Sequence, residues 1–383
     1  MPEAPLLYFD NNATTRVDPR VLEAMLPFLS EEYGNPSSGC RLGKRAAHAV
    51  AHAREQVAAL LGAEPGEIVF TSGGTEADNA AIHSALRLNP ERRHLVTTAV
   101  EHHAVLNPCE ALAAQGYAVD YLGVDDEGRL DMIEVEHKMR PDTALLSVMA
   151  ANNETGVLFP LAELAELART KGVFFHVDAV QAAGKVSLRL SELPVSYMSV
   201  ASHKIHGPKG VGALCVGRHT AWSPLLLGGG QERGRRAGTE NVPGIVGFGK
   251  AAELALAGLE REAAEVGALR DAFEQGVRER IPGVHIHGGG VPRLPNTSNI
   301  GFHGVEAESA LLLLERAKVC ASAGSACTAG SLQPSHVLRA MGCTREEARG
   351  SLRFSFSRFN TSAEIDRGVE ILAGVIARVR GAA

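Results

Sequence analysis

The sequence lacks the features that would assign it to several common classes of protein. Its six cysteines form no C-x-x-C pair, which argues against a disulfide framework and a zinc ribbon. No run of Lys and Arg occurs and the formal net charge is -6, so nucleic-acid binding is disfavoured. The N-terminus has no basic and apolar leader, and we see no apolar run of bilayer length. We therefore expect a cytoplasmic protein without a membrane or nucleic-acid partner.

The chain is long enough for more than one hydrophobic core. It has 383 residues, 45% of them hydrophobic and 21% charged, which is ordinary for a globular protein of two domains. Between residues 50 and 255, helical periodicity such as 161–171 alternates with short apolar runs, and residues 251–280 read as one long helix. The alternation predicts a mostly parallel sheet covered by helices. The apolar runs lie at 67–70, 94–97, 144–148, 173–177 and 197–200.

Polar residues follow each of these apolar runs. They lie at 71–76, 101–103, 152–154, 178–181 and 202–204. In open α/β sheets, ligands bind outside the carboxyl ends of the strands. We therefore expect these five segments to converge on one site.

The segment Ser72–Thr75 opens a predicted helix with small residues. Such residues let backbone N–H groups and the positive helix end approach an anion, which would make a phosphate site. An ordinary N-cap by a Ser or Thr side chain is the alternative. The segment is not a Walker loop, because no Gly-Lys-Ser/Thr follows it.

Two charged residues at strand ends suggest a cofactor with an aldehyde and a pyridine ring. Lys204 follows an apolar strand and precedes the turn Gly207–Gly210, and a desolvated amine there would attack an aldehyde. Asp178 ends another strand and needs a cationic partner, which a protonated pyridine nitrogen would supply. The alternatives are a solvated surface lysine, and an aspartate that caps a helix or joins an ion pair.

Histidines and arginines supply further candidates. His102 and His103 have no third residue spaced to join them as metal ligands, but one of them could stack on an aromatic ring and move protons. Arg353 is the lone charge in an apolar run and suits a carboxylate. The alternative for these histidines is a surface or structural role. The alternative for the segment Arg233–Arg236 is a solvated face.

Cys327 lies in the run of small residues at 321–331. Nothing there is large enough to anchor the segment in a core, so we expect a surface loop. An exposed thiol oxidises readily, whereas most free cysteines are buried, which favours a functional thiol. A neutral turn that happens to contain cysteine is the alternative. Cys320, beside Val319, reads as a core residue.

Together these motifs resemble the cysteine desulfurases of the pyridoxal-phosphate fold type I (class V aminotransferase) family. The resemblance covers almost the whole chain, and residues 10–16 and 331–336 are most similar to the nitrogen-fixation type. The shared motifs are Tyr8–Thr15, Gly34–Ser38, Thr71–Glu76, Glu101–His102, Asn152–Glu154, His176–Gln181, His203–Lys204, Gly238–Thr239, Ser325–Thr328 and Arg353–Ser355.

The resemblance implies a fold and a role for each site residue. The fold has a large domain (16–255) with a mostly parallel seven-stranded sheet, and a smaller α/β domain (1–15 and 256–383) that carries the cysteine loop. Lys204 would bind pyridoxal 5'-phosphate covalently, and Arg353 would receive the substrate carboxylate. The other implied ligands of cofactor or substrate are Gly74, Thr75, His102, Asn153, Asp178, Gln181, Ser202, His203 and, from the second subunit of a homodimer, Thr239.

The implied activity converts L-cysteine to alanine and leaves the sulfur on Cys327 as a persulfide. An iron–sulfur scaffold or another acceptor protein would receive the sulfur, with nitrogenase cluster maturation as one destination. Alternatives are a selenocysteine lyase or an aminotransferase of the same fold, or a non-catalytic sulfur carrier using Cys320 and Cys327. The sequence departs from the family at Ala201, where a phosphate-binding serine is usual, at Cys40, where histidine is common, and in its short C-terminal tail.

Overall fold

The computed structural model describes residues 5–324 and 334–381. Its main sheet has seven strands in the order β2-β8-β7-β6-β5-β3-β4. Strand β8 is antiparallel to both of its neighbours, and all other pairs are parallel, which confirms the expected mostly parallel sheet. The strands are β2 (Ile68–Thr71), β3 (His94–Thr98), β4 (Ala118–Leu122), β5 (Thr143–Met149), β6 (Phe174–Asp178), β7 (Tyr197–Ala201) and β8 (Gly212–Val216).

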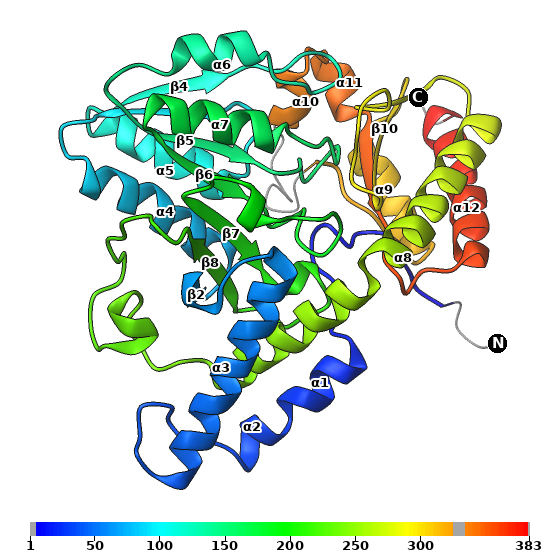
Figure 1. Cartoon of the computed structure of the whole chain (residues 1–383). Coiled ribbons are helices and arrows are strands. Elements are labelled where there is room, and N and C mark those ends of the chain that lie inside the picture. The colour runs from blue at the N-terminus through cyan, green and yellow to red at the C-terminus, as the bar shows by residue number, and fades with distance from the viewer. Residues whose placement is uncertain (1–4, 325–333, 382–383) are drawn as a thin grey trace.

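Helices cover both faces of this sheet (Figure 1). Ile68 and Phe70 of β2 pack in the core that also receives α3, α7 and the first half of α8, whereas Val69 packs in the core with α4 and α5. Burial on both faces explains why these strands read as continuous apolar runs. The helices are α3 (Arg41–Leu61), α4 (Gly74–Leu88), α5 (His103–Ala114), α6 (Met132–Lys138), α7 (Leu161–Lys171) and α8 (Val242–Arg280).

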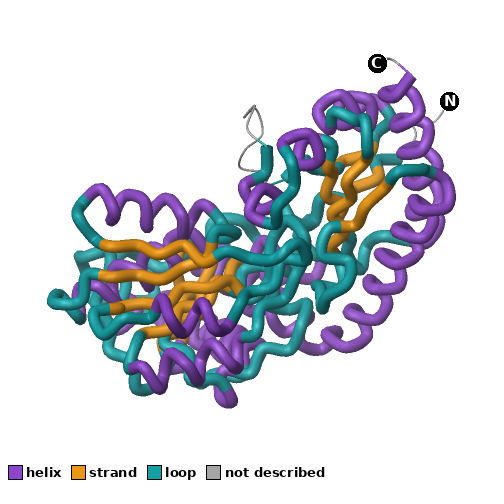
Figure 2. The backbone as a smooth tube through the Cα atoms, turned by 90° about the horizontal axis from the view of Figure 1, so that it is seen from above, coloured by secondary structure: helices purple, strands orange, loops and turns teal. Residues whose placement is uncertain are grey.

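A second, smaller unit has its own sheet and core (Figure 2). Its antiparallel sheet has the order β12-β10-β9, and the rings of Phe9, Phe273, Phe354 and Phe356 pack at centroid distances of 4.8 to 5.9 Å. The N-terminal strand β1 joins this unit by pairing with β11. Its elements are β1 (Leu7–Tyr8), β9 (Val284–Ile286), β10 (Thr297–Phe302), α9 (Ala307–Arg316), β11 (Val319–Cys320), β12 (Ser351–Ser355) and α12 (Ser362–Gly381).

The described residues also include the short α-helices α1 (Pro19–Met25), α2 (Pro27–Ser30), α10 (His336–Ala340) and α11 (Arg345–Arg349). Helix α8 contributes to both cores, with Phe248 in one and Phe273 in the other. The predicted domain boundary at residue 255 falls inside this helix and stays a prediction.

Helix α8 differs from the sequence-based expectation in two ways. It begins at Val242 rather than near residue 251, because the Asn241 side chain accepts a hydrogen bond from Gly244 and Pro243 occupies the first turn. It is also long and apolar enough, by length and composition alone, to cross a membrane, although we expected no such run. That apolar window is 56% buried against the rest of the protein, so its composition is explained by a core helix.

Candidate active site

A pocket lies at the carboxyl ends of the parallel strands and reaches the smaller unit. It encloses about 820 Å³ of space, part of it open to solvent. Asp178 at the end of β6 and Ala201 at the end of β7 line it, together with Asn12 and Ala13 from the N-terminal segment. The pocket brings together most of the residues that the sequence singled out, namely Gly74, Thr75, His102, Asn153, Asp178, Gln181, His203, Lys204 and Arg353.

Lys204 reaches across the pocket from the short turn that ends β7. Its Nζ donates to the backbone carbonyls of Asn12, at 2.5 Å, and Ala13, at 3.0 Å. The side chain of Gln181 donates to the same Asn12 carbonyl at 2.9 Å. The amine is therefore held inside the pocket by the N-terminal segment rather than lying on a solvated surface.

Asp178 is a buried carboxylate without a cationic hydrogen-bond partner among the described residues. Its Oδ1 accepts from the Val180 backbone N–H at 2.9 Å. Burial, and secondarily the nearby carboxylate of Asp78, raises the pKa of Asp178 to about 7. Burial likewise raises the pKa of Asp78 to about 7. Two such carboxylates favour a cationic group in this pocket.

Replacing Asp178 by asparagine is expected to stabilise the cofactor-free protein above neutral pH. The folded-state pKa lies above the unfolded value of 3.8, so the native wild type binds more protons between the two values and loses stability as pH rises through that window. The variant lacks this loss. Its free energy of unfolding should exceed that of the wild type by about 2–4 kcal/mol near pH 8, and by little near pH 4.

Denaturant unfolding of both cofactor-free proteins across this pH range measures the difference. Asp126→Asn, at an exposed position, serves as the control and should show no such gap. A gap of zero at every pH would contradict a buried, destabilised carboxylate at position 178.

The start of helix α4 is suited to an anion. Its N-cap is Gly73, and no side chain caps the helix, so the alternative of an ordinary Ser or Thr cap does not apply. A Cβ on Gly74 would lie 2.7 Å from Val180 Cγ2, so only glycine allows this close packing. Gly74 and Thr75 lie in the first turn of this 15-residue helix and line the pocket, which places the positive end of the helix beside it.

Two histidines in the pocket are neutral near pH 7. Burial, and then the charge of Lys204, lowers the pKa of His102 and of His203 to about 4. The His102 Nδ1 accepts from the Ala104 backbone N–H at 3.1 Å, which leaves the proton of the neutral ring on Nε2. A neutral imidazole can stack on an aromatic ring and accept a proton.

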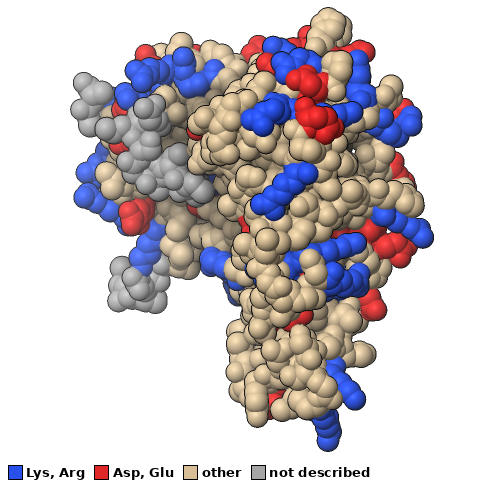
Figure 3. Space-filling view, turned by 90° about the vertical axis from the view of Figure 1, so that its left-hand side faces the viewer, with Lys and Arg blue, Asp and Glu red and all other residues tan. Residues whose placement is uncertain are grey.

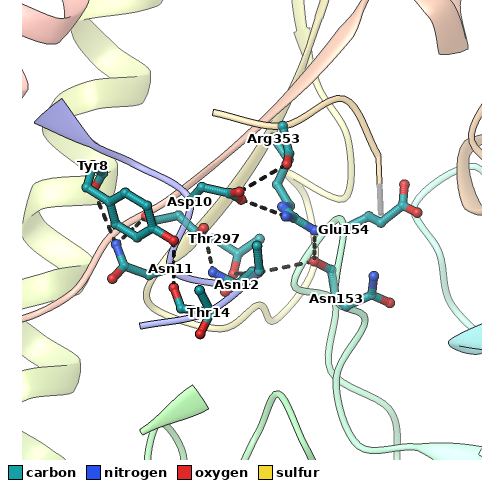
Figure 4. Close-up of polar contacts among 12 residues, drawn as sticks. Tyr8, Asp10, Asn11, Asn12, Thr14, Asn153, Glu154, Thr297 and Arg353 are labelled. Carbon is teal, nitrogen blue, oxygen red and sulfur yellow. Dashed lines mark hydrogen bonds and ion pairs between the residues drawn. The ribbon is translucent and has the colours of Figure 1, made fainter. Parts of the chain in front are cut away.

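Arg353 presents a prearranged guanidinium to the pocket (Figure 4). It is 1% exposed on strand β12. Its Nη2 donates to Asp10 Oδ1 at 2.7 Å and its Nη1 to the carbonyl of Asn153 at 3.1 Å. Its Nε is buried without a hydrogen-bond partner among the described residues. This geometry suits the binding of a carboxylate.

Comparison with known proteins places this pocket in a family. Residues 7–367 match the model of the family described as aminotransferase class-V. A cysteine desulfurase from Trichormus azollae is 54% identical over 98% of this chain and 94% of its own length. The cysteine desulfurase NifS from Azotobacter vinelandii is 51% identical over 98% of this chain and 93% of its own length.

The chain belongs to the class-V aminotransferases. A solved structure titled NifS-like protein superimposes with a TM-score of 0.92 at 39% identity, covering 98% of this chain and all of the other. The resemblance noted from the sequence motifs is thereby confirmed, and the relatives place this class-V aminotransferase among the cysteine desulfurases.

Two of the described residues singled out from the sequence, Ser202 and Thr239, are not brought into the pocket of this class-V aminotransferase. Ser202 is fully buried and does not line the pocket, because its hydroxyl lies 2.0 Å from where a Cβ on Gly207 would be. Ala201 lines the pocket instead. Thr239 is exposed and lies outside it, and Cys327 lies outside the described residues.

Cys320 is not the core residue that we expected. It is partly exposed at the end of β11. Burial of the thiol and the neighbouring Asp10 carboxylate raise its pKa. A thiol with a raised pKa forms little thiolate near neutral pH, which weighs against Cys320 as a sulfur carrier.

Ion pairs fasten the segment before Thr239 to helices α3 and α4. Glu232 has φ 47°, and its buried carboxylate accepts two hydrogen bonds from Arg54, both at 2.7 Å. Arg236 forms an ion pair with Glu76 in the first turn of α4, at 2.8 Å. Arg236 is therefore ion-paired and not part of a solvated face, whereas Arg233 is exposed.

Sequence reasoning missed two residues that organise the site. Asp10 holds Arg353, and Asn12 links the units by donating from Nδ2 to the Asn153 carbonyl at 3.2 Å and to Thr297 Oγ1 at 2.8 Å. Both lie in the motif Tyr8–Thr15 that carried the family resemblance. That motif was the available signal, although it precedes every strand of the main sheet.

Proposed function

We propose that this protein is a cysteine desulfurase that holds pyridoxal 5'-phosphate on Lys204 and transfers sulfur from L-cysteine to Cys327. The observation that carries the proposal is the single pocket in which Lys204, Asp178 and Arg353 meet. They provide an amine for an aldehyde, an anion for a pyridine nitrogen and a cation for a carboxylate.

The residues present fit the cofactor. Asp178 would pair with the protonated pyridine nitrogen, whose positive charge would favour the buried carboxylate. The N–H groups at the start of α4, with Thr75 and His203, would hold the phosphate. His102 would stack on the ring. Gln181 would approach the ring hydroxyl, and so would the side-chain amide of Asn153, whose Oδ1 is buried without a hydrogen-bond partner among the described residues. When bound, pyridoxal phosphate supplies an aldehyde that bonds amines and a ring that withdraws electrons from Cα.

The residues of the chain then carry the reaction on cysteine. Arg353 and Asn153 hold the substrate carboxylate, and the Lys204 amine accepts the Cα proton. The Cys327 thiolate attacks the substrate sulfur, so that an S–S bond forms as the C–S bond breaks. Protonation of the remaining three-carbon unit gives alanine and leaves a persulfide on Cys327. Neutral His102 is placed to accept and return protons.

A homodimer fits two features of the surface. Thr239 lies outside its own pocket and would enter the site of the second subunit, next to the phosphate. Leu22 in α1, Leu26 between the helices and Leu29 in α2 are 49%, 52% and 60% exposed. Both helices lie at the bottom of the molecule in Figure 1, and the projection at the bottom of Figure 3 carries few charged side chains. Exposed apolar patches of this kind mark protein interfaces.

The sulfur would pass from Cys327 to an acceptor protein. The relatives named cysteine desulfurase, NifS among them, support an iron–sulfur scaffold as that acceptor. A cytoplasmic location is consistent with this role.

A direct test combines absorbance with product analysis. The purified protein should show the visible band of a lysine-bound cofactor, which changes when L-cysteine is added. With a thiol reductant present to reduce the persulfide, it should release alanine and sulfide without any keto-acid acceptor. Dependence on a keto acid would instead indicate an aminotransferase. A rate with selenocysteine far above that with cysteine would indicate a selenocysteine lyase.

A further inference from the structure

Glu154 is a buried carboxylate next to the pocket with no role in the chemistry described so far. It follows Asn153, which lines the pocket, and Figure 4 shows the two residues side by side near Arg353. Glu154 is 0% exposed. Its Oε2 accepts a hydrogen bond from Ser335 Oγ at 2.5 Å, and its Oε1 is buried without a hydrogen-bond partner among the described residues. Burying a carboxylate in this way is costly, so the contact with Ser335 matters to the local structure.

Both flanks of the segment 325–333 lie near this carboxylate. Gly324 precedes the segment, and a Cβ on it would lie 3.3 Å from Glu154 Oε2 and 3.5 Å from the Ser335 Cβ. Gly324 has φ +75°, a conformation that glycine adopts without strain. Ser335 also caps helix α10 by accepting from the Leu338 backbone N–H at 3.2 Å. Glu154 therefore accepts a hydrogen bond from Ser335, just after the segment, and lies close to Gly324, just before it.

Further hydrogen bonds tie the same flanks to the pocket. The backbone N–H of Ser322 donates to the Arg353 carbonyl at 3.1 Å, and the Arg353 N–H donates back to Ser322 at 2.6 Å. On the other flank, the His336 ring lies 2.9 Å from the Glu101 carbonyl, next to His102. Glu154 lies close to both flanks.

We propose that Glu154 is a positioning residue that fixes both ends of the segment carrying Cys327 relative to the pocket. The inference rests on the proposed function, in which Cys327 receives the sulfur. Described flanks that are fixed beside the pocket set where the chain leaves and re-enters this part of the molecule, and the placement of a reacting group has a large effect on rate. Glu154 itself touches neither substrate nor cofactor in this account.

The test separates the pocket from the sulfur transfer in the holoenzyme. After mixing with L-cysteine, the change in cofactor absorbance reports substrate binding and Cα chemistry, and mass spectrometry of quenched samples reports the persulfide on Cys327. For Glu154→Ala we expect the absorbance change within twofold of wild type and persulfide formation slower by roughly 10–100-fold, the size expected for a misplaced reacting group. Glu154→Gln keeps an oxygen acceptor for Ser335 and should retain most of the rate.

Two further variants complete the design. Ser335→Ala removes the donor to Glu154 and should slow persulfide formation in the same direction, which keeps the test available if Glu154→Ala fails to fold. Glu274→Ala is the matched control, because Glu274 is 5% exposed and pairs with Arg293 at 2.9 Å away from the pocket. Glu274→Ala should lower the stability of the protein without changing the ratio between the rate of the absorbance change and the rate of persulfide formation.

Two results would overturn the inference. One is a wild-type rate of persulfide formation in Glu154→Ala and Ser335→Ala. The other is an equal fall in both rates, which would assign Glu154 to the pocket as a whole. Persulfide formation that persists in Cys327→Ala would instead overturn the proposed function, so the two failures are distinguishable.

Discussion

Lys204→Ala is expected to abolish alanine formation from cysteine. The variant loses the amine that bonds the cofactor and the base that accepts the Cα proton, and each of these functions contributes large factors to rate. We expect a fall in kcat of at least roughly 10³-fold and the loss of the visible band of lysine-bound cofactor. Absorbance spectroscopy and quantification of alanine measure both effects.

The matched control is Lys209→Ala. Lys209 lies five positions further along the same turn region and is exposed, so its removal should change neither the spectrum nor the rate. Alanine formation at the wild-type rate in Lys204→Ala, with the visible band retained, would show that the cofactor assignment is wrong.

Cys327→Ala is expected to separate cofactor chemistry from sulfur transfer. The pocket keeps Lys204, Asp178 and Arg353, so the visible band and its change on addition of cysteine should be those of the wild type. Persulfide on the protein should be absent, and turnover should fall by roughly 10²-fold or more, because the nucleophile that takes the sulfur is missing. Mass spectrometry of the intact protein and sulfide release provide the measurements.

Two other cysteines serve as controls for this variant. Cys40 is exposed at the N-cap of α3, and Cys320 belongs to the alternative reading of a non-catalytic sulfur carrier. Neither Cys40→Ala nor Cys320→Ala should remove the persulfide. A persulfide that persists in Cys327→Ala and disappears in Cys320→Ala would move the acceptor role to Cys320.

The strands predicted from apolar runs are buried on both faces of the sheet, although the equally buried β8 (Gly212–Val216) was not among them. The runs at 67–70 and 197–200 lie within one residue of β2 and β7, because helices on both sides require apolar residues at every position. Strand β4 escaped detection since it is an edge strand in which Ala118 and Tyr121 are exposed. An edge strand of that composition carries no continuous apolar signal.

The convergence of polar residues at strand ends could also be predicted, because parallel topology alone places Asp178 and the turn with Lys204 at one edge. Contacts between distant segments could not. The ion pair of Asp10 with Arg353 joins residues 343 positions apart, and Glu154 meets Ser335 across 181 positions. Whether Ala201 or Ser202 lines the pocket depends on the direction of the tight turn after β7. No periodic pattern of apolar residues predicts that direction.

The most direct test of the central claim is a single turnover with L-cysteine that carries a heavy sulfur isotope. The holoenzyme, free of reductant, is mixed with a limiting amount of this substrate, quenched, alkylated and digested. The account predicts that alanine forms in an amount equal to the labelled sulfur found on the peptide containing Cys327. Alanine formation with no heavy sulfur on that peptide would contradict it.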